Sequence, residues 1–214
     1  MPSNFKLIYY NLTGRGEPIR MLLTYGGVPF EDSRFEWDDW PKIKPTMPLG
    51  QVPVLEIDGK RYTQTIPLCR YLGRMLKLDG KDDMENLAID SAVEILWDVL
   101  KVAYERNWET SDEKKKQLDA KLHTLSPLLL GKLEEDVKRN GGFIALNRIT
   151  WADIVFLCSY EDMMNLVPEK DPFEGFANLR QLKNKLLENE NLREYIKKRP
   201  VNKMMNRFSL ISDL

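Results

Sequence analysis

The order of strand and helix signals along the chain limits the fold more than any other feature of this sequence. Up to about residue 78, short runs rich in β-branched and aromatic residues alternate with segments of helical periodicity. We predict strands over 6–10, 31–35, 54–57 and 61–62, a hairpin turn at Asp58-Gly59, and helices over 17–25 and 66–76. This order, β-α-β, an irregular stretch and then β-β-α, predicts an α/β N-terminal domain.

The second part of the chain carries only helical patterns. A polar stretch around residues 78–83 precedes it and is interpreted as a linker. Apolar positions three and four apart predict helices over 87–103, 114–140, 151–166 and 179–198. Thr150 and Asp153 form a capping-box pattern in front of the most apolar of these helices. We therefore predict two domains, an α/β domain over 1–80 and an all-helical domain over 81–214.

Charge and composition exclude several classes of function. The 32 lysines and arginines are balanced by 33 aspartates and glutamates, so no excess of positive charge is available for nucleic acid. His123, the single histidine, and two scattered cysteines cannot build a metal cluster, and we expect no metal. The apolar runs fall short of the roughly 18 to 20 residues of a membrane span, and the N-terminus lacks a signal-peptide pattern. We expect a cytoplasmic protein that does not bind membranes.

The cysteines and the charged runs are given structural interpretations. Cys69 and Cys158 lie in apolar stretches, which favours two buried thiols over a disulfide in a cytoplasmic protein. The charged runs at 112–116 and 197–199 are typical of solvated helix ends. Neither run is expected to form a binding patch.

Three local features of the first domain suit a small, acidic peptide thiol, which needs backbone partners, donors for its carboxylates and a group that stabilises its thiolate. Val52-Pro53 precedes a strand, where a cis proline would leave backbone groups free, although an ordinary turn explains the pattern equally well. Thr65, after Gln64, is the expected N-cap of the helix that follows. This helix N-terminus is interpreted either as an anion site or as an ordinary cap. Tyr9 and Tyr10 are adjacent in a strand, so only one is expected to face a given site.

Taken together, these motifs resemble a known family. The chain carries, in order, Tyr9-Tyr-Asn-Leu-Thr-Gly-Arg15-Gly-Glu-Pro-Ile-Arg20, Asp39-Trp40-Pro-Lys-Ile-Lys44, Pro48-Leu-Gly-Gln51-Val52-Pro53-Val-Leu-Glu-Ile-Asp-Gly, Gln64-Thr65, Arg70-Tyr-Leu-Gly and Thr150-Trp-Ala-Asp153. They are similar in order and spacing to the motifs of the sigma class of cytosolic glutathione transferases, particularly its insect-like members. The resemblance extends from about residue 4 to about residue 200.

The resemblance implies a fold, a reaction and a set of site residues. It implies a thioredoxin-like N-terminal domain that binds glutathione as co-substrate, an all-helical C-terminal domain that holds a small hydrophobic electrophile, and a homodimer. Tyr9 matches the catalytic tyrosine, whose hydroxyl donates a hydrogen bond to the glutathione sulfur, and Arg15 supports this region. The implied glutathione contacts are Trp40, Lys44, Gln51, Val52, Pro53, Gln64, Thr65 and the partner subunit's Asp98.

One tyrosine is sufficient to favour the thiolate of glutathione over the thiol. Lowering a thiol pKa by about two units corresponds to roughly 2.7 kcal/mol, and one hydrogen bond to a charged group contributes about 1.5 to 3 kcal/mol. The electrophile pocket is expected across the domain gap from this thiolate. Its expected lining is Leu12, Thr13, Leu100, Ala103, Tyr104 and Trp108.

The sequence departs from the family pattern at two places. Thr65 stands where the family has serine; it keeps the hydroxyl and adds a methyl group, so binding is expected to survive. The tail over 203–214 is longer than the class pattern, and it forms either an apolar lid over the electrophile pocket or a frayed or packing extension. The apolar residues of this tail are Met204, Met205, Phe208, Leu210 and Ile211.

The leading hypothesis is conjugation of the glutathione thiolate to hydrophobic electrophiles, such as xenobiotics and products of lipid peroxidation. Isomerisation of a prostaglandin-type endoperoxide, which some sigma members perform, is decided by no residue of the sequence. A non-catalytic protein like the lens crystallins of this class is disfavoured because the thiol site is retained at Tyr9, Arg15 and Gln51. A thiol oxidoreductase is disfavoured because the loop over 11–15 contains no cysteine.

Overall fold

The N-terminal half is built around a four-stranded mixed sheet, in a computed structural model that describes residues 4–167, 171–200 and 208–211. The strands are β1 (Phe5–Tyr10), β2 (Glu31–Phe35), β3 (Val54–Ile57) and β4 (Lys60–Thr63), in the order β2-β1-β3-β4. Helix α1 (Glu17–Tyr25) connects β1 to β2, and these two strands run parallel. Strand β3 pairs antiparallel with both β1 and β4. The predicted strands are confirmed.

The connections between these strands also follow the predicted pattern. The hairpin turn at Asp58 and Gly59 has φ values of 47° and 81°, which suits a two-residue turn with positive φ at both positions. Between β2 and β3 lie three short helices, η2 (Trp37–Asp39), α2 (Trp40–Ile43) and η3 (Lys44–Thr46). Most side chains of this irregular stretch are exposed. The Val52-Pro53 peptide is cis.

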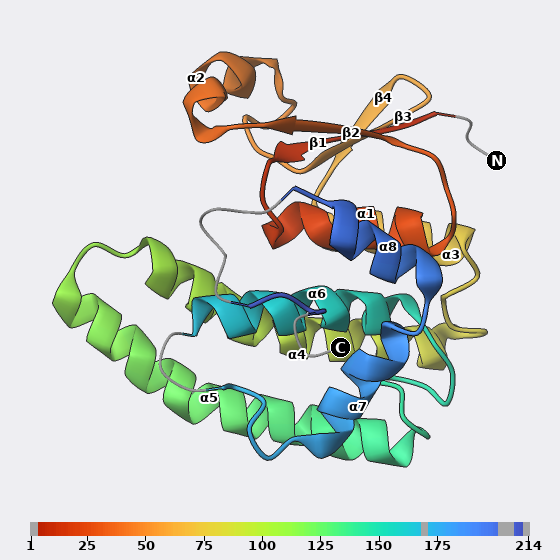
Figure 1. The fold of residues 1–214 in the computed structure, drawn as a ribbon, viewed down its shortest axis with the longest axis vertical. Helices are drawn as coiled ribbons and strands as arrows, with labels where there is room; N and C mark the ends of the chain where they lie inside the picture. Colours follow the sequence, from red (N-terminus) through yellow and green to blue (C-terminus); the bar gives the residue numbers. More distant parts are fainter. Residues whose placement is uncertain (1–3, 168–170, 201–207, 212–214) are drawn as a thin grey trace.

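The C-terminal half is all-helical in the described residues. Its helices are α4 (Asp83–Trp108), α5 (Asp112–Arg139), α6 (Trp151–Leu166), α7 (Ala177–Leu186) and α8 (Glu190–Lys198). Figure 1 shows α6 in the interior, close to α4 and to the helices α1 and α3 (Thr65–Met75) that cover the sheet, and the contacts of α6 agree. Consistent with this position, almost every residue of α6 is buried. The capping box predicted at Thr150 and Asp153 is present at its start.

One predicted helix is divided in two. We predicted a single helix over 179–198, but α7 ends at Leu186 and α8 begins at Glu190. Asn189 is the N-cap of α8, and its side-chain oxygen accepts the backbone N–H of Leu192 at 3.0 Å. An asparagine that satisfies an otherwise unpaired helix N–H favours a new helix start over continuation, which accounts for the break.

The two halves together confirm the predicted fold class, a thioredoxin-like N-terminal domain followed by a helical C-terminal domain. Figure 1 also shows α8, the last helix of the C-terminal half in the described residues, lying alongside α1 of the N-terminal half. Cys69 and Cys158 are both buried free thiols, as predicted. No helix in the described ranges combines the length and apolar character needed to cross a membrane.

Candidate functional site

Tyr9 lies at the carboxyl end of β1 and is held by the loop that follows it. Its hydroxyl oxygen accepts the backbone N–H of Arg15, in the short helix η1 (Gly14–Gly16), at 3.0 Å. The loop approaches the ring so closely that a Cβ on Gly16 would lie 2.3 Å from Tyr9 Cδ1, and one on Gly14 would lie 2.9 Å from the hydroxyl. The two glycines therefore allow the tyrosine to sit against backbone.

The surroundings of Tyr9 keep its hydroxyl protonated at neutral pH. Burial raises the pKa of Tyr9 well above its usual value, and the negative charge of Asp162 acts in the same direction. The Arg15 N–H and the charges of Arg20 and Arg15 lower the pKa, but they do not offset burial. The hydroxyl hydrogen has no acceptor among the residues that the structure describes, so it is available to donate to an anion.

A cavity of about 250 Å³ opens beside Tyr9, between the loop after β1 and helix α4. Tyr9 and Tyr10 both line it, so the expectation that only one of them faces the site is wrong. Tyr10 reaches the cavity because its ring stacks on Trp37, with centroids 4.2 Å apart, and is thereby part of an aromatic cluster at the cavity edge. The lining residues are Tyr9, Tyr10, Leu12, Gly14, Arg15, Trp37, Tyr104, Asn107, Trp108 and Leu166.

The cavity contains half of the residues predicted for the electrophile pocket. Leu12, Tyr104 and Trp108 line it, whereas Thr13, Leu100 and Ala103 are buried and do not belong to the lining given above. Sequence reasoning missed Trp37, Asn107 and Leu166. The spacing of Tyr104, Asn107 and Trp108 along α4, three and four residues, was a usable signal, because such residues share one helix face.

Comparison with known proteins gives a consistent result over nearly the whole chain. The family model described as Glutathione S-transferase, N-terminal domain matches residues 5–74, and that described as Glutathione S-transferase, C-terminal domain matches residues 97–199. A glutathione S-transferase of Anopheles gambiae is 40% identical over 94% of this chain and 98% of the relative. The chain belongs to the glutathione S-transferase family. It is accordingly a transferase, and the family uses glutathione as its co-substrate.

Solved structures of similar proteins have the same fold as this chain. The structure of prostaglandin synthase D of Nilaparvata lugens has a TM-score of 0.87 and 36% identity, covering 93% of this chain and 100% of that one. The sigma class glutathione S-transferase of Fasciola hepatica has a TM-score of 0.83 and 34% identity, covering 93% and 98%. The predicted function, transfer of glutathione to electrophiles, is confirmed as that of the family.

The residues predicted to hold the glycine end of glutathione lie on the exposed stretch between β2 and β3. Trp40 is partly buried, because its ring stacks on Phe35 with centroids 5.8 Å apart. Lys44 and Gln51 are exposed, and the Lys44 side chain lies against Gly50. Lys44 is a cation and Gln51 is an amide donor, and an exposed cation and donor are suited to a carboxylate ligand.

The residues predicted to bind the rest of glutathione lie where β3 and α3 begin. Val52 precedes β3, and its backbone forms no hydrogen bond among the described residues; Pro53 beside it is buried. Thr65 was expected to be the N-cap of α3, but Gln64 is the N-cap and Thr65 is the first helical residue. The Thr65 hydroxyl instead donates to the carbonyl oxygen of Arg15 at 3.0 Å, which ties α3 to the Tyr9 loop.

Gln64 has an unusual backbone conformation for a residue with a side chain. Its φ is 75°, and no side chain caps the first turn of α3. A left-handed conformation at a residue other than glycine costs of the order of 1 to 3 kcal/mol and is common at ligand-binding positions. The first turn of α3 therefore has no side-chain cap and lies beside the exposed Gln64 side chain, a combination suited to a carboxylate ligand.

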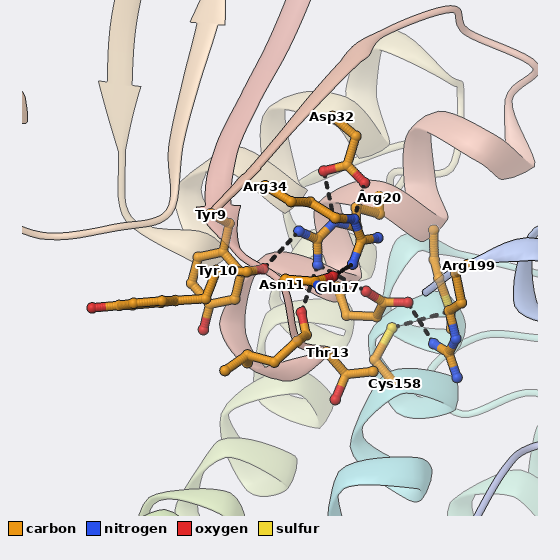
Figure 2. A network of polar contacts seen from close by, with 12 residues as sticks. Tyr9, Tyr10, Asn11, Thr13, Glu17, Arg20, Asp32, Arg34, Cys158 and Arg199 are labelled. Atoms are coloured by element: carbon orange, nitrogen blue, oxygen red, sulfur yellow. Dashed lines mark hydrogen bonds and ion pairs between the residues drawn. The ribbon is translucent and has the colours of Figure 1, made fainter. Parts of the chain in front are cut away.

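A buried ionic network fixes the loop that carries this site. Figure 2 shows Arg20 between Asp32 and Glu17, with Arg199 on the other side of Glu17. Arg20 also donates to the carbonyl oxygens of Leu12 at 2.7 Å and Tyr10 at 3.1 Å. Although burial acts to raise it, the charges of Arg199 and Arg20 hold the pKa of Glu17 below its usual value. The network connects the Tyr9 loop to the end of α8.

Arg199 corrects the prediction made for the charged run at 197–199. Lys197 and Lys198 are exposed and pair with Glu194 on α8, as solvated residues of a helix end do. Arg199 is 9% exposed in its side chain and pairs with both Glu17 and Glu161. The run was misjudged because the chain leaves α8 at Arg199 and turns this side chain inward, which helical periodicity does not reveal.

The remaining predicted site residue lies apart from the cavity. Asp98 is exposed on α4 and pairs with Lys101 at 3.4 Å. It does not belong to the cavity lining of its own subunit. Among the residues that the structure describes, no group of three histidine, cysteine, aspartate or glutamate side chains is placed to hold a metal ion.

Proposed function

We propose that Tyr9 activates glutathione in this transferase by donating its hydroxyl hydrogen to the glutathione sulfur. The observation that carries the proposal is the hydrogen bond from the Arg15 N–H to the Tyr9 oxygen, combined with the burial that keeps the hydroxyl protonated. A neutral, oriented donor stabilises the thiolate relative to the thiol by about 1.5 to 3 kcal/mol. The side chain of Arg15, close to the same cavity, adds positive charge.

Glutathione is proposed to extend from the cavity across the N-terminal domain, taken as residues 1–80. Its glycine carboxylate contacts Trp40, Lys44 and Gln51, and its cysteinyl backbone pairs with Val52 beside Pro53. Its γ-glutamyl end contacts Gln64 and Thr65. This placement is supported by the exposed donors of the irregular stretch, the unpaired backbone of Val52 and the uncapped first turn of α3.

The electrophile is proposed to occupy the cavity between this domain and the helical domain, residues 81–214. Its apolar part contacts Leu12, Tyr104 and Trp108. Thr13, Leu100 and Ala103 are buried and are not among the residues that line the cavity. The thiolate attacks the electrophilic carbon directly, and the enzyme contributes the thiolate and the proximity of the two reactants. Xenobiotics and products of lipid peroxidation belong to this substrate class.

The chain is further proposed to be a cytoplasmic, homodimeric enzyme of the sigma class that acts in detoxification. Similarity to the sigma class transferase of Fasciola hepatica supports the class. A dimer is supported by large apolar side chains that are exposed on α3 and α4, where Tyr71, Met84 and Leu87 are 39%, 72% and 58% exposed. In such a dimer the partner subunit's Asp98 contacts the γ-glutamyl end of glutathione.

A second candidate function is favoured by one comparison. The solved structure with a TM-score of 0.87 is that of a prostaglandin synthase D, so isomerisation of an endoperoxide is the alternative use of the same thiolate. Assays with a prostaglandin endoperoxide and with an unsaturated aldehyde distinguish the two functions. A non-catalytic, crystallin-like role remains disfavoured, because such a protein has no need for a buried hydroxyl donor beside a cavity.

The test of the proposal is a pH titration of bound glutathione, followed by the ultraviolet absorbance of the thiolate. The protein is expected to lower the thiol pKa by about two units, roughly 2.7 kcal/mol, and Tyr9→Phe is expected to remove most of this shift. Tyr10→Phe is the matched control, since the neighbouring tyrosine lines the same cavity without bonding to Arg15. Binding without a shift in the wild type, or equal shifts in both variants, would refute the role of Tyr9.

A further inference from the structure

A buried carboxyl group lies behind the electrophile cavity and binds two hydroxyl groups. Asp162 of α6 is 2% exposed. Its Oδ2 accepts the hydroxyl of Tyr104, on α4, at 2.5 Å, and its Oδ1 accepts the hydroxyl of Thr13, in the loop after β1, at 3.0 Å. Tyr104 lines the cavity, whereas Asp162 does not. Asp162 thus contacts the cavity through Tyr104.

Asp162 has no cationic partner among the residues that the structure describes. The neighbouring acids Glu17 and Glu161 are both paired with Arg199, which leaves Asp162 with hydroxyl donors only. Burial raises the pKa of Asp162 to about 7, and the charges of Glu161 and Glu17 act in the same direction. The charged and titratable groups that act on or are acted on by this cluster are Tyr9, Arg15, Glu17, Tyr104, Cys158 and Glu161.

We propose that Asp162 is a positioning residue that decides whether the Tyr104 hydroxyl accepts or donates a hydrogen bond in the electrophile cavity. When Asp162 is ionised, both hydroxyl hydrogens point toward it, and Tyr104 offers only lone pairs to the substrate. When Asp162 is protonated, its own hydrogen can bond to the Tyr104 oxygen. The Tyr104 hydrogen is then free to turn toward the substrate. The inference rests on the proposed use of this cavity by the electrophile.

The donating form of Tyr104 favours one class of electrophile. When glutathione adds to an α,β-unsaturated aldehyde, its sulfur bonds to the β-carbon. The electron pair of the carbon–carbon double bond shifts toward the carbonyl group, and an enolate forms with negative charge on its oxygen. The enolate then takes a proton from water at the α-carbon. A hydroxyl donor at the developing enolate oxygen stabilises the transition state. In the reaction of an alkyl iodide, iodide leaves and no oxygen gains charge, so Tyr104 has no such effect.

The pH dependence follows from these two states. Asp162 gains its proton as the pH falls through about 7, so the donating form of Tyr104 predominates below neutrality. The ratio of kcat/KM for the unsaturated aldehyde to kcat/KM for the alkyl iodide is therefore expected to rise as the pH falls. Both reactions consume the same glutathione thiolate, and the ratio cancels the titration of that thiolate.

The experiment measures this ratio with trans-2-nonenal and 1-iodohexane between about pH 5.5 and pH 8.5. The wild-type ratio is expected to change about tenfold, the effect of one hydrogen bond to a charged oxygen. Asp162→Asn carries a donor and an acceptor at every pH, so its ratio is expected to stay at the low-pH value. Tyr104→Phe lacks the hydroxyl, so its ratio is expected to stay at or below the high-pH value.

Two results would overturn the inference. One is a wild-type ratio that does not vary with pH. The other is a ratio that varies equally in the wild type and in Tyr104→Phe. Both comparisons can be made even if Asp162→Asn fails to fold. Failure of the proposed function is distinguishable, because it would remove the Tyr9-dependent thiolate shift and the turnover of both electrophiles. A difference infrared spectrum between the wild type and Asp162→Asn adds a readout without turnover: a protonated carboxyl band that titrates near neutrality is expected, and its absence contradicts the inference.

Discussion

The chain uses the same local motif at two helix starts that differ completely in burial. At the start of α6, the backbone N–H of Thr150 donates to the Asp153 carboxylate at 2.7 Å, and both residues are fully buried. At the start of η2, the backbone N–H of Glu36 donates to the Asp39 carboxylate at 3.2 Å, and both residues are exposed. The motif sets the start of a helix in either place, while burial determines what its loss costs.

The difference in burial between the two motifs reflects the different roles of the two regions. Asp153 also accepts the N–H of Ile144 at 2.9 Å and thereby ties the loop before α6 to the core. Burial raises the pKa of Asp153 to about 6 in spite of these donors. The exposed stretch from Glu36 to Gln51 has few such ties and presents side chains to solvent. Buried polar groups position the site, and the exposed stretch carries the proposed contacts to the glycine end of glutathione.

The largest effect that this comparison predicts is at Arg199. Arg199→Met removes the cation that pairs with Glu17 and Glu161 and leaves buried carboxylates without full compensation. The free energy of unfolding is expected to fall by about 3 to 5 kcal/mol. Lys198→Met, at the exposed neighbour, is expected to change it by less than about 0.5 kcal/mol. Urea denaturation of both variants checks this, and equal losses would contradict the distinction between buried and exposed ion pairs.

A smaller effect is expected when the two capping boxes are removed in turn. Asp153→Ala leaves the buried N–H groups of Ile144 and Thr150 without acceptors, and it is expected to cost about 2 to 3 kcal/mol of unfolding free energy. Asp39→Ala leaves the exposed backbone N–H of Glu36 to bond to water and is expected to cost less than about 1 kcal/mol. The same denaturation measurement checks both variants. Similar costs at the two sites would mean that burial does not control the strength of the motif.

The comparison also separates what the sequence alone could predict from what it could not. Strands and helices were predictable, because periodicity and turn residues act over a few neighbours, as at the Asp58-Gly59 hairpin. The inward turn of Arg199 was not, because its partners Glu17 and Glu161 are distant in the chain. These charged residues are evident in the sequence, but none of their neighbours indicates that they form ion pairs with one another.

In the candidate site, too, contacts between residues distant in the sequence could not be predicted. Tyr9 was predictable from its motif, and Tyr104 and Trp108 from their position on α4. Leu100 was assigned to the cavity with them, but it is 2% exposed, because one turn before Tyr104 the same face of α4 is covered by the core. Asp162 was not identified, since nothing near it in the sequence indicates that Thr13 and Tyr104 donate to it.

The smallest effect expected is on the exposed stretch, and it concerns binding. Lys44→Met removes a proposed contact to the glycine carboxylate of glutathione, and it is expected to weaken glutathione binding about fivefold, close to the 1 kcal/mol upper value of an exposed ion pair. The free energy of unfolding is expected to change by less than about 0.5 kcal/mol, because the side chain is exposed. Lys42→Met, an exposed lysine of the same stretch without a proposed contact, is the matched control for isothermal titration calorimetry. Equal affinity in both variants would remove Lys44 from the binding site, whereas a loss of stability in Lys44→Met would show that this stretch contributes to the fold as the buried region does.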